Sequence, residues 1–449
     1  MRATPRNEGA ALSDIPSPDR KITGRALALN PVYRGAPGRD RDPEARLAEC
    51  VSLAKAIELE VAYAETFAIA RVRSPTLFGS GLVERFAGLI QTFEIGIVVV
   101  NAPLTPVQQR NLERQLNAKV IDRTGLILEI FGARARTHEG TLQVELAAMS
   151  YQRSRLVRSW THLERQRGGF GFMGGPGESQ IEIDRRLIDQ RISKLKRQLE
   201  TVRRTRMLHR KARNKVPYPV VALVGYTNAG KSTLFNRLTG AEVLAKDLLF
   251  ATLDPTMRKL DLPSGRKIIL SDTVGFISDL PTMLVAAFRA TLEEVCEADI
   301  IVHVRDIAHP ETSEQKEDVE AVLMELGFKD APKTIEVLNK IDLLDPEEQA
   351  AVMERARRNV AAIPLSALSG DGCDHFLENI EEEITQGSRV LKLELDSSEG
   401  AALAWLHQHG NVVDQKLEHS GEMRLSVILD KADEARFYHR FGRSVTRYG

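Results

Sequence analysis

The chain has 449 residues, 28% of them charged and 43% hydrophobic, which is typical of a globular protein with about two to four domains. Lysines and arginines balance the acids at 62 each, so net charge gives no evidence for a nucleic-acid partner. Cys50, Cys296 and Cys373 lack the spacing of a zinc site or a disulfide framework, Met1 to Arg20 lacks the apolar core of a secretory signal, and no apolar run is long enough to span a bilayer. These features predict a cytoplasmic protein and exclude a secreted disulfide scaffold.

The first part of the chain is expected to be a tail followed by an α/β domain. Residues 1–42 carry Pro, Gly and Arg without periodicity, which predicts a disordered, solvated tail. In residues 43–140 helix-like segments (45–59 and 81–93) alternate with strand-like ones (within 61–72 and at 95–100). Thr105 and Pro106 are suited to begin a further helix, as N-cap and first-turn residue. The alternation predicts a small parallel sheet.

Residues 141–213 are expected to form a projecting, antiparallel helical hairpin. Apolar residues recur at steps of three and four in two segments, with Leu146, Met149, Leu156, Trp160 and Leu163 in the first and Ile181, Ile188, Ile192, Leu195, Leu199 and Val202 in the second. Between them, residues 168–177 contain too much glycine for a helix. A hairpin of two helices with a glycine-rich tip is the simplest arrangement.

The tip of this hairpin has a composition that suits contact with RNA. Phe170, Phe172 and Met173 alternate with glycines, so rings could stack on bases while the backbone approaches closely. The alternative is a flexible linker without a binding role. The second helix continues into a basic run, from Arg203 to Lys215, that suits phosphate contacts, although such a run is often only a solvated face. Together the two features favour RNA.

A phosphate-binding loop is expected at Gly225 to Ser232, which follows the apolar run 220–224 and precedes a helix-like segment. Two glycines allow backbone N–H groups to curl around phosphate, and the helix N-terminus adds a favourable dipole. Lys231 can reach the terminal phosphates and Ser232 can ligate Mg²⁺. The flanking strand and helix signals make a chance glycine-rich turn the weaker interpretation.

Two later segments are expected to sense the γ-phosphate. Asp272 follows a strand-like run and can lie near Mg²⁺, and the N–H group of Gly275 can meet the phosphate. Upstream, Thr252 or Thr256 could close over Mg²⁺ through a hydroxyl, and the pattern favours Thr252, although a surface-loop threonine is the alternative.

The residue after Gly275 points to slow intrinsic hydrolysis. Many related GTPases carry a glutamine there that orients the attacking water, and the ring of Phe276 cannot do so by hydrogen bonding. Asn228 could ligate a monovalent cation, such as K⁺, that replaces an arginine finger. An equally good interpretation is that Asn228 ties the loop to itself.

Asn339 to Asp342 is expected to read the base. The carboxylate of Asp342 can accept from the N1–H and amino groups of guanine, whereas adenine offers an acceptor and a C–H there, so GTP should be preferred over ATP. Asn339 and Lys340 would brace the phosphate loop and cover the base. Ser366 to Leu368 is placed to add a backbone contact.

The motifs give the following set of expected roles. Nucleotide binding is expected from Gly225, Tyr226, Thr227, Asn228, Ala229, Gly230, Lys231, Ser232, Thr233, Phe250, Thr252, Asp272, Gly275, Asn339, Lys340, Asp342, Ser366, Ala367 and Leu368. Lys231, Thr252 and Gly275 are the expected catalytic residues, and Ser232, Thr252 and Asp272 the metal ligands. They lie in an expected GTPase domain, 214–388, with a Ras-like, mostly parallel sheet. Residues 389–449 predict a compact α+β domain with the order strand, helix, strand, strand, helix.

The chain resembles the HflX family of translational GTPases over nearly its whole length apart from the tail. Besides the general motifs, the resemblance rests on residues 168–172 and 175–178, 180–182 and 184–186, 250–254, 272–277, 280–281 and 291–294. Ser179 stands where threonine is commoner, and Leu82 where lysine is frequent, which affects local contacts only.

The resemblance implies a cytoplasmic GTPase, expected to be a monomer without a membrane span, that binds the large ribosomal subunit. It places the hairpin tip near the peptidyl-transferase region and implies splitting or rescue of stalled ribosomes under stress. Hydrolysis stimulated by the ribosome would then drive release. The alternatives are an ATP-using RNA remodelling enzyme, since some members are reported to use ATP, a ribosome-assembly GTPase, or a signalling GTPase whose hairpin grips a protein.

Overall fold

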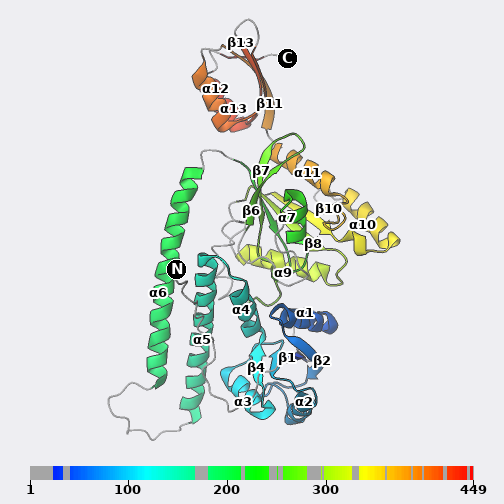
Figure 1. Ribbon diagram of the computed structural model, residues 1–449. Helices are drawn as coiled ribbons and strands as arrows, with labels where there is room; N and C mark the ends of the chain where they lie inside the picture. Colours follow the sequence, from blue (N-terminus) through cyan, green and yellow to red (C-terminus); the bar gives the residue numbers. More distant parts are fainter. Residues whose placement is uncertain are drawn as a thin grey trace, which may run out of the picture.

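The described residues form three sheets that follow one another along the molecule (Figure 1). The structure is a computed structural model and describes residues 24–33, 41–166, 180–213, 218–241, 250, 256–280, 295, 298–325, 333–358, 362–385, 388–396, 399–417, 422–441 and 445–447. Among these residues, no helix combines the length and the apolar character needed to cross a membrane.

The N-terminal sheet is parallel, with strand order β2-β1-β3-β4, as the alternation of elements predicted. Its strands are β1 (Arg25–Tyr33), β2 (Glu60–Ile69), β3 (Ile97–Val100) and β4 (Lys119–Asp122), and its helices are α1 (Pro43–Ala56), α2 (Ser80–Thr92), α3 (Pro106–Leu116) and α4 (Arg123–Arg134). The helix start predicted at Thr105 is confirmed. Gln108 N donates to Thr105 Oγ1 at 3.2 Å and Thr105 N donates to Gln108 Oε1 at 2.9 Å, which closes a capping box.

The expectation of a solvated tail through residue 42 is wrong for residues 25–33. These residues form β1, which lies inside the sheet and pairs with β2 on one side and β3 on the other. Ala26 to Leu29 are fully buried, as expected for a parallel strand that is covered on both faces. The nine residues of the strand are a minority of this segment and are followed by Arg, Gly and Pro, so composition averaged over 42 residues concealed it.

Two long helices, α5 (His138–Gln166) and α6 (Gln180–Arg213), run side by side along the molecule (Figure 1). Their contact contains Leu142 of α5 and Leu195 and Leu199 of α6, with Leu146, Met149 and Val202 packed around them. Glu145 pairs with Arg191, and Arg153 pairs with Asp189 at 2.9 Å. From Glu145 to Arg153 the chain advances along α5, whereas their partners step back along α6 from Arg191 to Asp189, so the two helices are antiparallel. The glycine-rich segment predicted for the tip, 168–177, lies outside the described residues.

The central sheet has the order β10-β9-β8-β5-β7-β6, with only the β6–β7 pairing antiparallel. Its strands are β5 (Val220–Val224), β6 (Thr256–Asp261), β7 (Lys267–Asp272), β8 (Ile300–Asp306), β9 (Lys333–Asn339) and β10 (Ala362–Pro364). The helices described around it are α7 (Lys231–Thr239), α9 (Thr312–Glu325), α10 (Pro346–Arg358) and α11 (Cys373–Thr385), with the short helix η1 (Ile341–Leu343). This is the mostly parallel P-loop fold that the sequence predicted.

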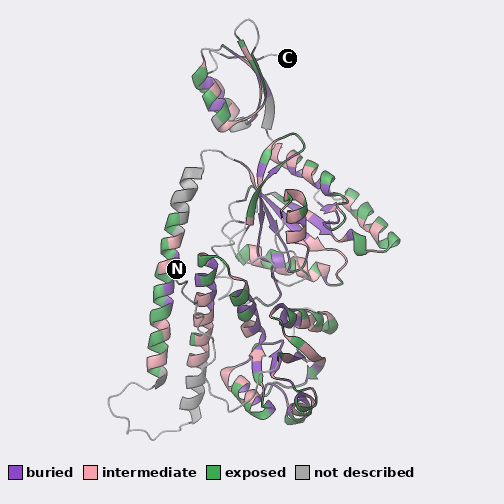
Figure 2. Cartoon of the chain, viewed as in Figure 1, coloured by how far each residue is buried: buried purple, intermediate pink, exposed green. Residues whose placement is uncertain are grey.

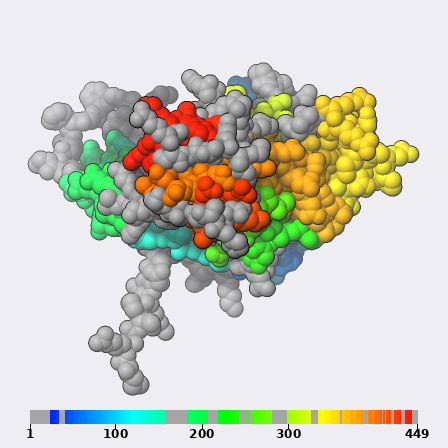
Figure 3. Space-filling view, turned by 90° about the horizontal axis from the view of Figure 1, so that it is seen from above, coloured from blue at the N-terminus to red at the C-terminus, as the bar shows by residue number. Residues whose placement is uncertain are grey.

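The C-terminal sheet is antiparallel, with the order β12-β13-β11-β14. It comprises β11 (Ser388–Asp396), α12 (Gly400–His409), β12 (Asn411–Leu417), β13 (Glu422–Asp430), α13 (Lys431–Phe441) and β14 (Val445–Arg447). The expected order of elements is found, with β14 added at the end; a strand of three residues is too short to show a periodicity. Viewed from this end, the orange and red unit lies over the middle of the molecule (Figure 3).

One hydrophobic core joins the N-terminal sheet to the central sheet. Buried residues of α1, α4 and α5 belong to the same cluster as Tyr226, Phe250 and Phe276 of the central unit. Phe131 of α4 meets Phe250 edge to face, with ring centroids 4.7 Å apart. Figure 2 shows the buried positions in purple, concentrated in the strands and on the helix faces that turn toward them.

Candidate functional site

The predicted phosphate loop lies at the carboxyl end of β5 and leads into α7, between β7 and β8. Gly230, the residue before α7, has a φ of +95°, and an added Cβ would lie 2.1 Å from Asn339 Nδ2. A side chain there would displace Asn339, so glycine is required for both reasons. Asn228 has a φ of +60°, a conformation that asparagine tolerates better than most residues.

Lys231 is buried at the base of this loop. Its Nζ donates to the carbonyl oxygens of Gly225 at 3.0 Å and Tyr226 at 2.7 Å. Burial lowers the pKa of Lys231 to about 8, against an opposing effect of the nearby Asp272 carboxylate. The amine is therefore held within the curl of the loop, where phosphate oxygens would compete for its protons.

A hydroxyl and a carboxylate meet beside Lys231. Ser232 Oγ donates to Asp272 Oδ2 at 2.7 Å, because β7 pairs with β5 and ends level with the loop. Hard oxygen donors of this kind suit Mg²⁺, which is held in phosphate sites by one or two protein ligands and the phosphates themselves. Among the described residues no group of three or more His, Cys, Asp or Glu could hold a metal ion. Thr252, the third expected ligand, lies outside the described residues.

The segment after Asp272 is hydrogen-bonded to the phosphate loop. Thr227 N donates to Phe276 O at 2.7 Å, and Phe276 N donates to Gly225 O at 3.1 Å. Gly275 sits so close that an added Cβ would be 2.9 Å from Thr227 Cα and 3.1 Å from Lys231 Nζ. The Phe276 ring turns away into the shared core and is 1% exposed, so it cannot contact a water molecule in the site.

The residues expected to read the base are also brought to this edge. Asn339 Nδ2 donates to Ala229 O at 2.8 Å, and its Oδ1 accepts from Ala367 N at 2.9 Å, so one side chain braces both loops. Lys340 Nζ donates to Asp306 Oδ2 at 2.7 Å. Asp342 lies in η1 with its side chain exposed.

The Ser366 to Leu368 loop is held from two sides. Ser366 is buried, and its Oγ accepts from Ser369 N at 3.1 Å, while Leu368 is exposed. Arg237 of α7, which sequence reasoning missed, donates through Nε to Ala367 O at 2.6 Å and also bonds Leu368 O. An arginine on an ordinary helix face carries no signal of this role in a single sequence.

Sequence analysis also missed a cluster of buried polar side chains beneath the phosphate loop. Tyr226 Oη donates to Glu49 of α1 and accepts from Ser278 N at 2.8 Å. Arg123, at the start of α4, donates to Glu49 Oε2 at 2.8 Å, to Ser278 O at 2.9 Å and to Asn101 Oδ1 at 2.6 Å. Three of these residues, Glu49, Asn101 and Arg123, lie far upstream of the loop in the chain, so sequence spacing gave no clue to the contact.

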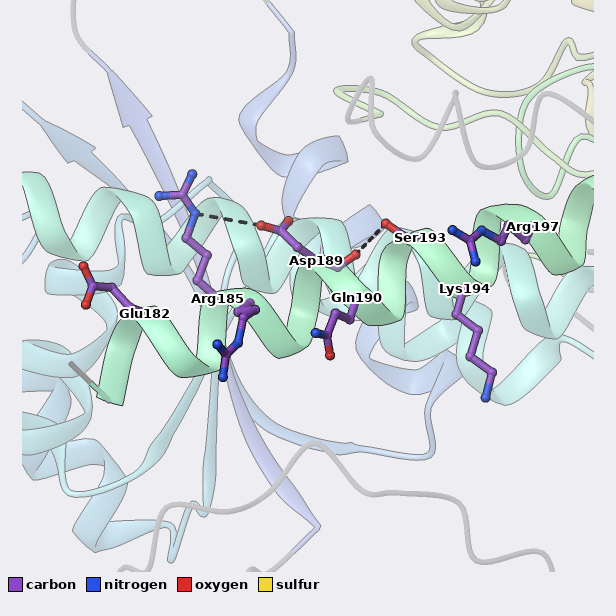
Figure 4. A pocket seen from close by; sticks show the side chains of 8 residues that line it. Glu182, Arg185, Asp189, Gln190, Ser193, Lys194 and Arg197 are labelled. Carbon is purple, nitrogen blue, oxygen red and sulfur yellow. Dashed lines mark hydrogen bonds and ion pairs between the residues drawn. The ribbon is translucent and has the colours of Figure 1, made fainter. Parts of the chain in front are cut away.

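A groove along α6 is separate from this site. Its lining includes Arg185, Asp189, Lys194 and Arg197, which Figure 4 shows along one helix. Arg186 also lines it. The Asp189 carboxylate pairs with Arg185 at 4.0 Å and with Arg153 of α5 at 2.9 Å. The groove is mainly basic, and part of its charge is compensated within the helix pair.

Fold and site together define a P-loop nucleotide-binding protein of the GTPase class. Four family models match along the chain: "GTP-binding GTPase N-terminal" over residues 44–132, "GTP-binding GTPase Middle Region" over 134–213, "50S ribosome-binding GTPase" over 220–340 and "HflX C-terminal domain" over 351–447. The chain belongs to the HflX family of GTPases.

Similar curated proteins carry the same family name over most of the chain. The GTPase HflX of Magnetococcus marinus is 52% identical over 416 residues, which is 93% of either chain, and that of Escherichia coli is 42% identical over 92% of this chain and 96% of its own. A GTP-binding protein from Sulfolobus solfataricus, solved in complex with GDP, is 24% identical with a TM-score of 0.44, and the match covers 81% of this chain and 99% of that one.

Proposed function

We propose that the chain is a guanine-nucleotide switch in which Lys231, Ser232 and Asp272 hold the phosphates and Mg²⁺. The observation that carries the proposal is the 2.7 Å contact of Ser232 with Asp272 beside the buried Lys231. Mg²⁺ bound by these oxygens supplies charge neutralisation for the β- and γ-phosphates. Gly275 lies next to Lys231, where its N–H group suits the γ-phosphate, and Thr252 is assigned to close over the metal.

Hydrolysis is proposed to be slow until a partner accelerates it. The Phe276 ring is packed into the core, so it contributes nothing to positioning water. Asn228 either ligates a monovalent cation or ties the phosphate loop to itself. Measuring GTP hydrolysis in potassium and in sodium buffers distinguishes these two roles. Faster turnover in potassium supports a cation bound near Asn228, and equal rates leave only the role of tying the loop to itself.

Guanine selectivity is assigned to Asp342, supported by Asn339 and the Ala367 N–H group. Calorimetric titration with GDP and with ADP tests this assignment directly. We expect GDP to bind far more tightly, because a site built to hydrogen-bond one base leaves polar groups unpaired with the other. Asp342→Asn should reduce the preference, and comparable affinities in the wild type would favour the ATP-using alternative.

The partner is proposed to be the large ribosomal subunit, approached by the α5–α6 hairpin. The "50S ribosome-binding GTPase" match over residues 220–340 and the basic residues along α6 support this proposal. The finer role proposed is cytoplasmic splitting or rescue of stalled ribosomes under stress by a monomer whose tip approaches the peptidyl-transferase region.

Cosedimentation with purified subunits tests the partner. The protein is loaded with a non-hydrolysable GTP analogue or with GDP and mixed with large or small subunits. We expect selective, analogue-dependent binding to the large subunit, and hydrolysis stimulated by that subunit. Absence of binding in both nucleotide states would reject the assignment. Dissociation of intact ribosomes into subunits then separates splitting from rescue or assembly.

A further inference from the structure

The buried polar group beneath the phosphate loop joins two domains. Glu49 and Arg123 come from the N-terminal α/β unit, whereas Tyr226 and Ser278 come from the GTPase unit. The Glu49 carboxylate accepts from the Tyr226 hydroxyl, from Arg123 at 2.8 Å and from Ser278 Oγ at 3.2 Å. Arg123 in turn donates to Ser278 O at 2.9 Å and to Ser278 Oγ at 2.8 Å. Each of the four side chains thus bonds across the boundary between the units.

These contacts are strong because both charged groups are largely buried. The side chains of Arg123 and Glu49 are 4% and 15% exposed. Burial disfavours the charge on Glu49, but Arg123 and the hydrogen bonds from Tyr226 and Ser278 outweigh it and hold its pKa below the ordinary value. Removing one member of such a group leaves the others buried with unmet hydrogen bonds, which is costly.

The two GTPase residues in the group belong to the loops that would contact phosphate. Tyr226 lies in the phosphate loop, and its carbonyl oxygen accepts from Lys231 at 2.7 Å. Ser278 follows Gly275 by three residues, in the segment that Phe276 ties to the loop. Glu49 and Arg123 therefore hold both loops at fixed positions, with Gly275 beside Lys231.

Hydrogen bonds within the N-terminal unit fix the position of the Arg123 side chain, so Arg123 can in turn fix the position of the loops that it contacts. Asn101, at the end of β3, accepts from Arg123 at 2.6 Å and donates to Asn30 of β1 at 3.0 Å. Asn30, Asn101 and Arg123 are each at most 3% exposed. The chain of hydrogen bonds thus runs from the interior of the N-terminal sheet to the phosphate loop without crossing solvent.

We infer that Glu49 and Arg123 are positioning residues of the nucleotide site, supplied by the N-terminal domain, that favour GTP over GDP. They hold Gly275 next to Lys231, where the γ-phosphate of GTP would lie and which GDP leaves unused. The inference rests on the proposed nucleotide switch. It adds that triphosphate recognition depends on residues outside the GTPase domain.

The test uses the full chain and the variants Tyr226→Phe, Glu49→Gln and Arg123→Lys. Affinities for fluorescent GDP and for a fluorescent, non-hydrolysable GTP analogue are measured, with far-UV circular dichroism and thermal melts to show that each variant is folded. We expect the affinity for the analogue to fall about tenfold more than that for GDP, as for the loss of a hydrogen bond to a charged group. The double variant Glu49→Gln/Tyr226→Phe should lose less than the product of the two single effects, because both act on the same contact: one removes the charge of its acceptor and the other removes its donor.

Glu311→Gln is the matched control. Glu311 of the GTPase unit accepts from Asp42 N at 2.9 Å, so this substitution also changes a largely buried carboxylate that crosses the boundary, but one outside the phosphate loops. Its ratio of analogue to GDP affinity should stay at the wild-type value. An unchanged ratio in folded Tyr226→Phe and Arg123→Lys, or an equal loss for both nucleotides, would overturn the inference alone. A wild type that binds neither nucleotide would reject the proposed function itself.

Discussion

Lys231 illustrates how burial prepares a single residue for an anionic ligand. Its pKa is lowered to about 8 from the usual 10.5 because the ammonium is removed from water. A phosphate beside it favours the charged form, so binding raises the pKa. Between the two pKa values, binding must take up a proton, and affinity should fall as pH rises above about 8, by at most about tenfold per pH unit.

This pH dependence can be measured by calorimetry. GDP is titrated at about pH 8.5 in two buffers with different ionisation enthalpies, where Lys231 is partly neutral in the free protein. We expect the observed binding enthalpy to differ between the buffers in the sense of proton uptake, and to differ less at about pH 7. Identical enthalpies at the higher pH would show that Lys231 keeps its proton in the free protein.

Arg237 joins the helix after the phosphate loop to the loop that is proposed to contact the base. Its Nε donates to Ala367 O at 2.6 Å. We expect Arg237→Ala to weaken GDP binding about tenfold, since a charge-assisted hydrogen bond that positions the Ala367 N–H group is lost. Stopped-flow measurement of GDP release should show the change mainly as faster dissociation. The same substitution at Arg258, exposed on β6, is the control, and equal rates for the two variants would refute the role.

Sequence analysis could identify site residues that belong to a local motif, but it missed residues whose contacts are with residues distant in the sequence. Lys231, Ser232 and Asn339 could be proposed from the sequence because phosphate and base recognition require fixed residue types at fixed distances from a strand end. Asn339 was given the task of bracing the phosphate loop, and its bond to Ala229 O shows that contact. Glu49, Arg123 and Arg237 act through contacts that only folding creates, so no local pattern marks them.

At the scale of elements, the α5–α6 contact depends on a small apolar cluster. Leu195 is fully buried against α5, whereas Leu187 on the same helix is 55% exposed. We expect Leu195→Ala to destabilise the helix pair by about 2–5 kcal/mol through a cavity, and Leu187→Ala by much less. Hydrogen exchange measured by mass spectrometry on α5 and α6 compares the two variants. Similar exchange rates in both would mean that the helices do not depend on each other.

The elements most accurately predicted were those with an unambiguous local signal. Thr105 with Pro106 marked the start of α3 because an N-cap hydroxyl and a first-turn proline each satisfy a helix terminus. β1 was missed because a fully buried parallel strand has no alternation of polar and apolar residues, and a run as short as Ala26 to Leu29 is ambiguous without its neighbours.

At the scale of the whole molecule, the shared core means that the N-terminal and GTPase units pack as one body. Phe131 and Phe250 are in edge-to-face contact at this boundary, and Phe250 immediately precedes the segment expected to hold Thr252. Phe250, at the start of one segment expected to sense the γ-phosphate, and Ser278, near the end of the other, thus both contact the N-terminal unit. A displacement of residues in one unit can therefore be transmitted to the other unit through this shared core.

The position of β1 leads to a prediction about shortened chains. Without β1, its neighbours β2 and β3 would face each other across about 10 Å, too far to pair. A chain beginning at Pro43 should therefore aggregate, because two unpaired strand edges are exposed. A chain beginning at Gly24 should stay in solution, as judged by the yield of monomer in size-exclusion chromatography. Equal yields would show that the sheet tolerates the loss.

The position of β1 between two later strands also affects how the N-terminal domain folds during translation. β1 is the first strand of the sheet to be made, yet both strands that flank it are made later, and β3 follows only after α1, β2 and α2. During translation β1 must therefore wait for β2 before it can pair at all, and for β3 before both of its edges are paired. The polar residues that precede it would help to keep that waiting strand in solution.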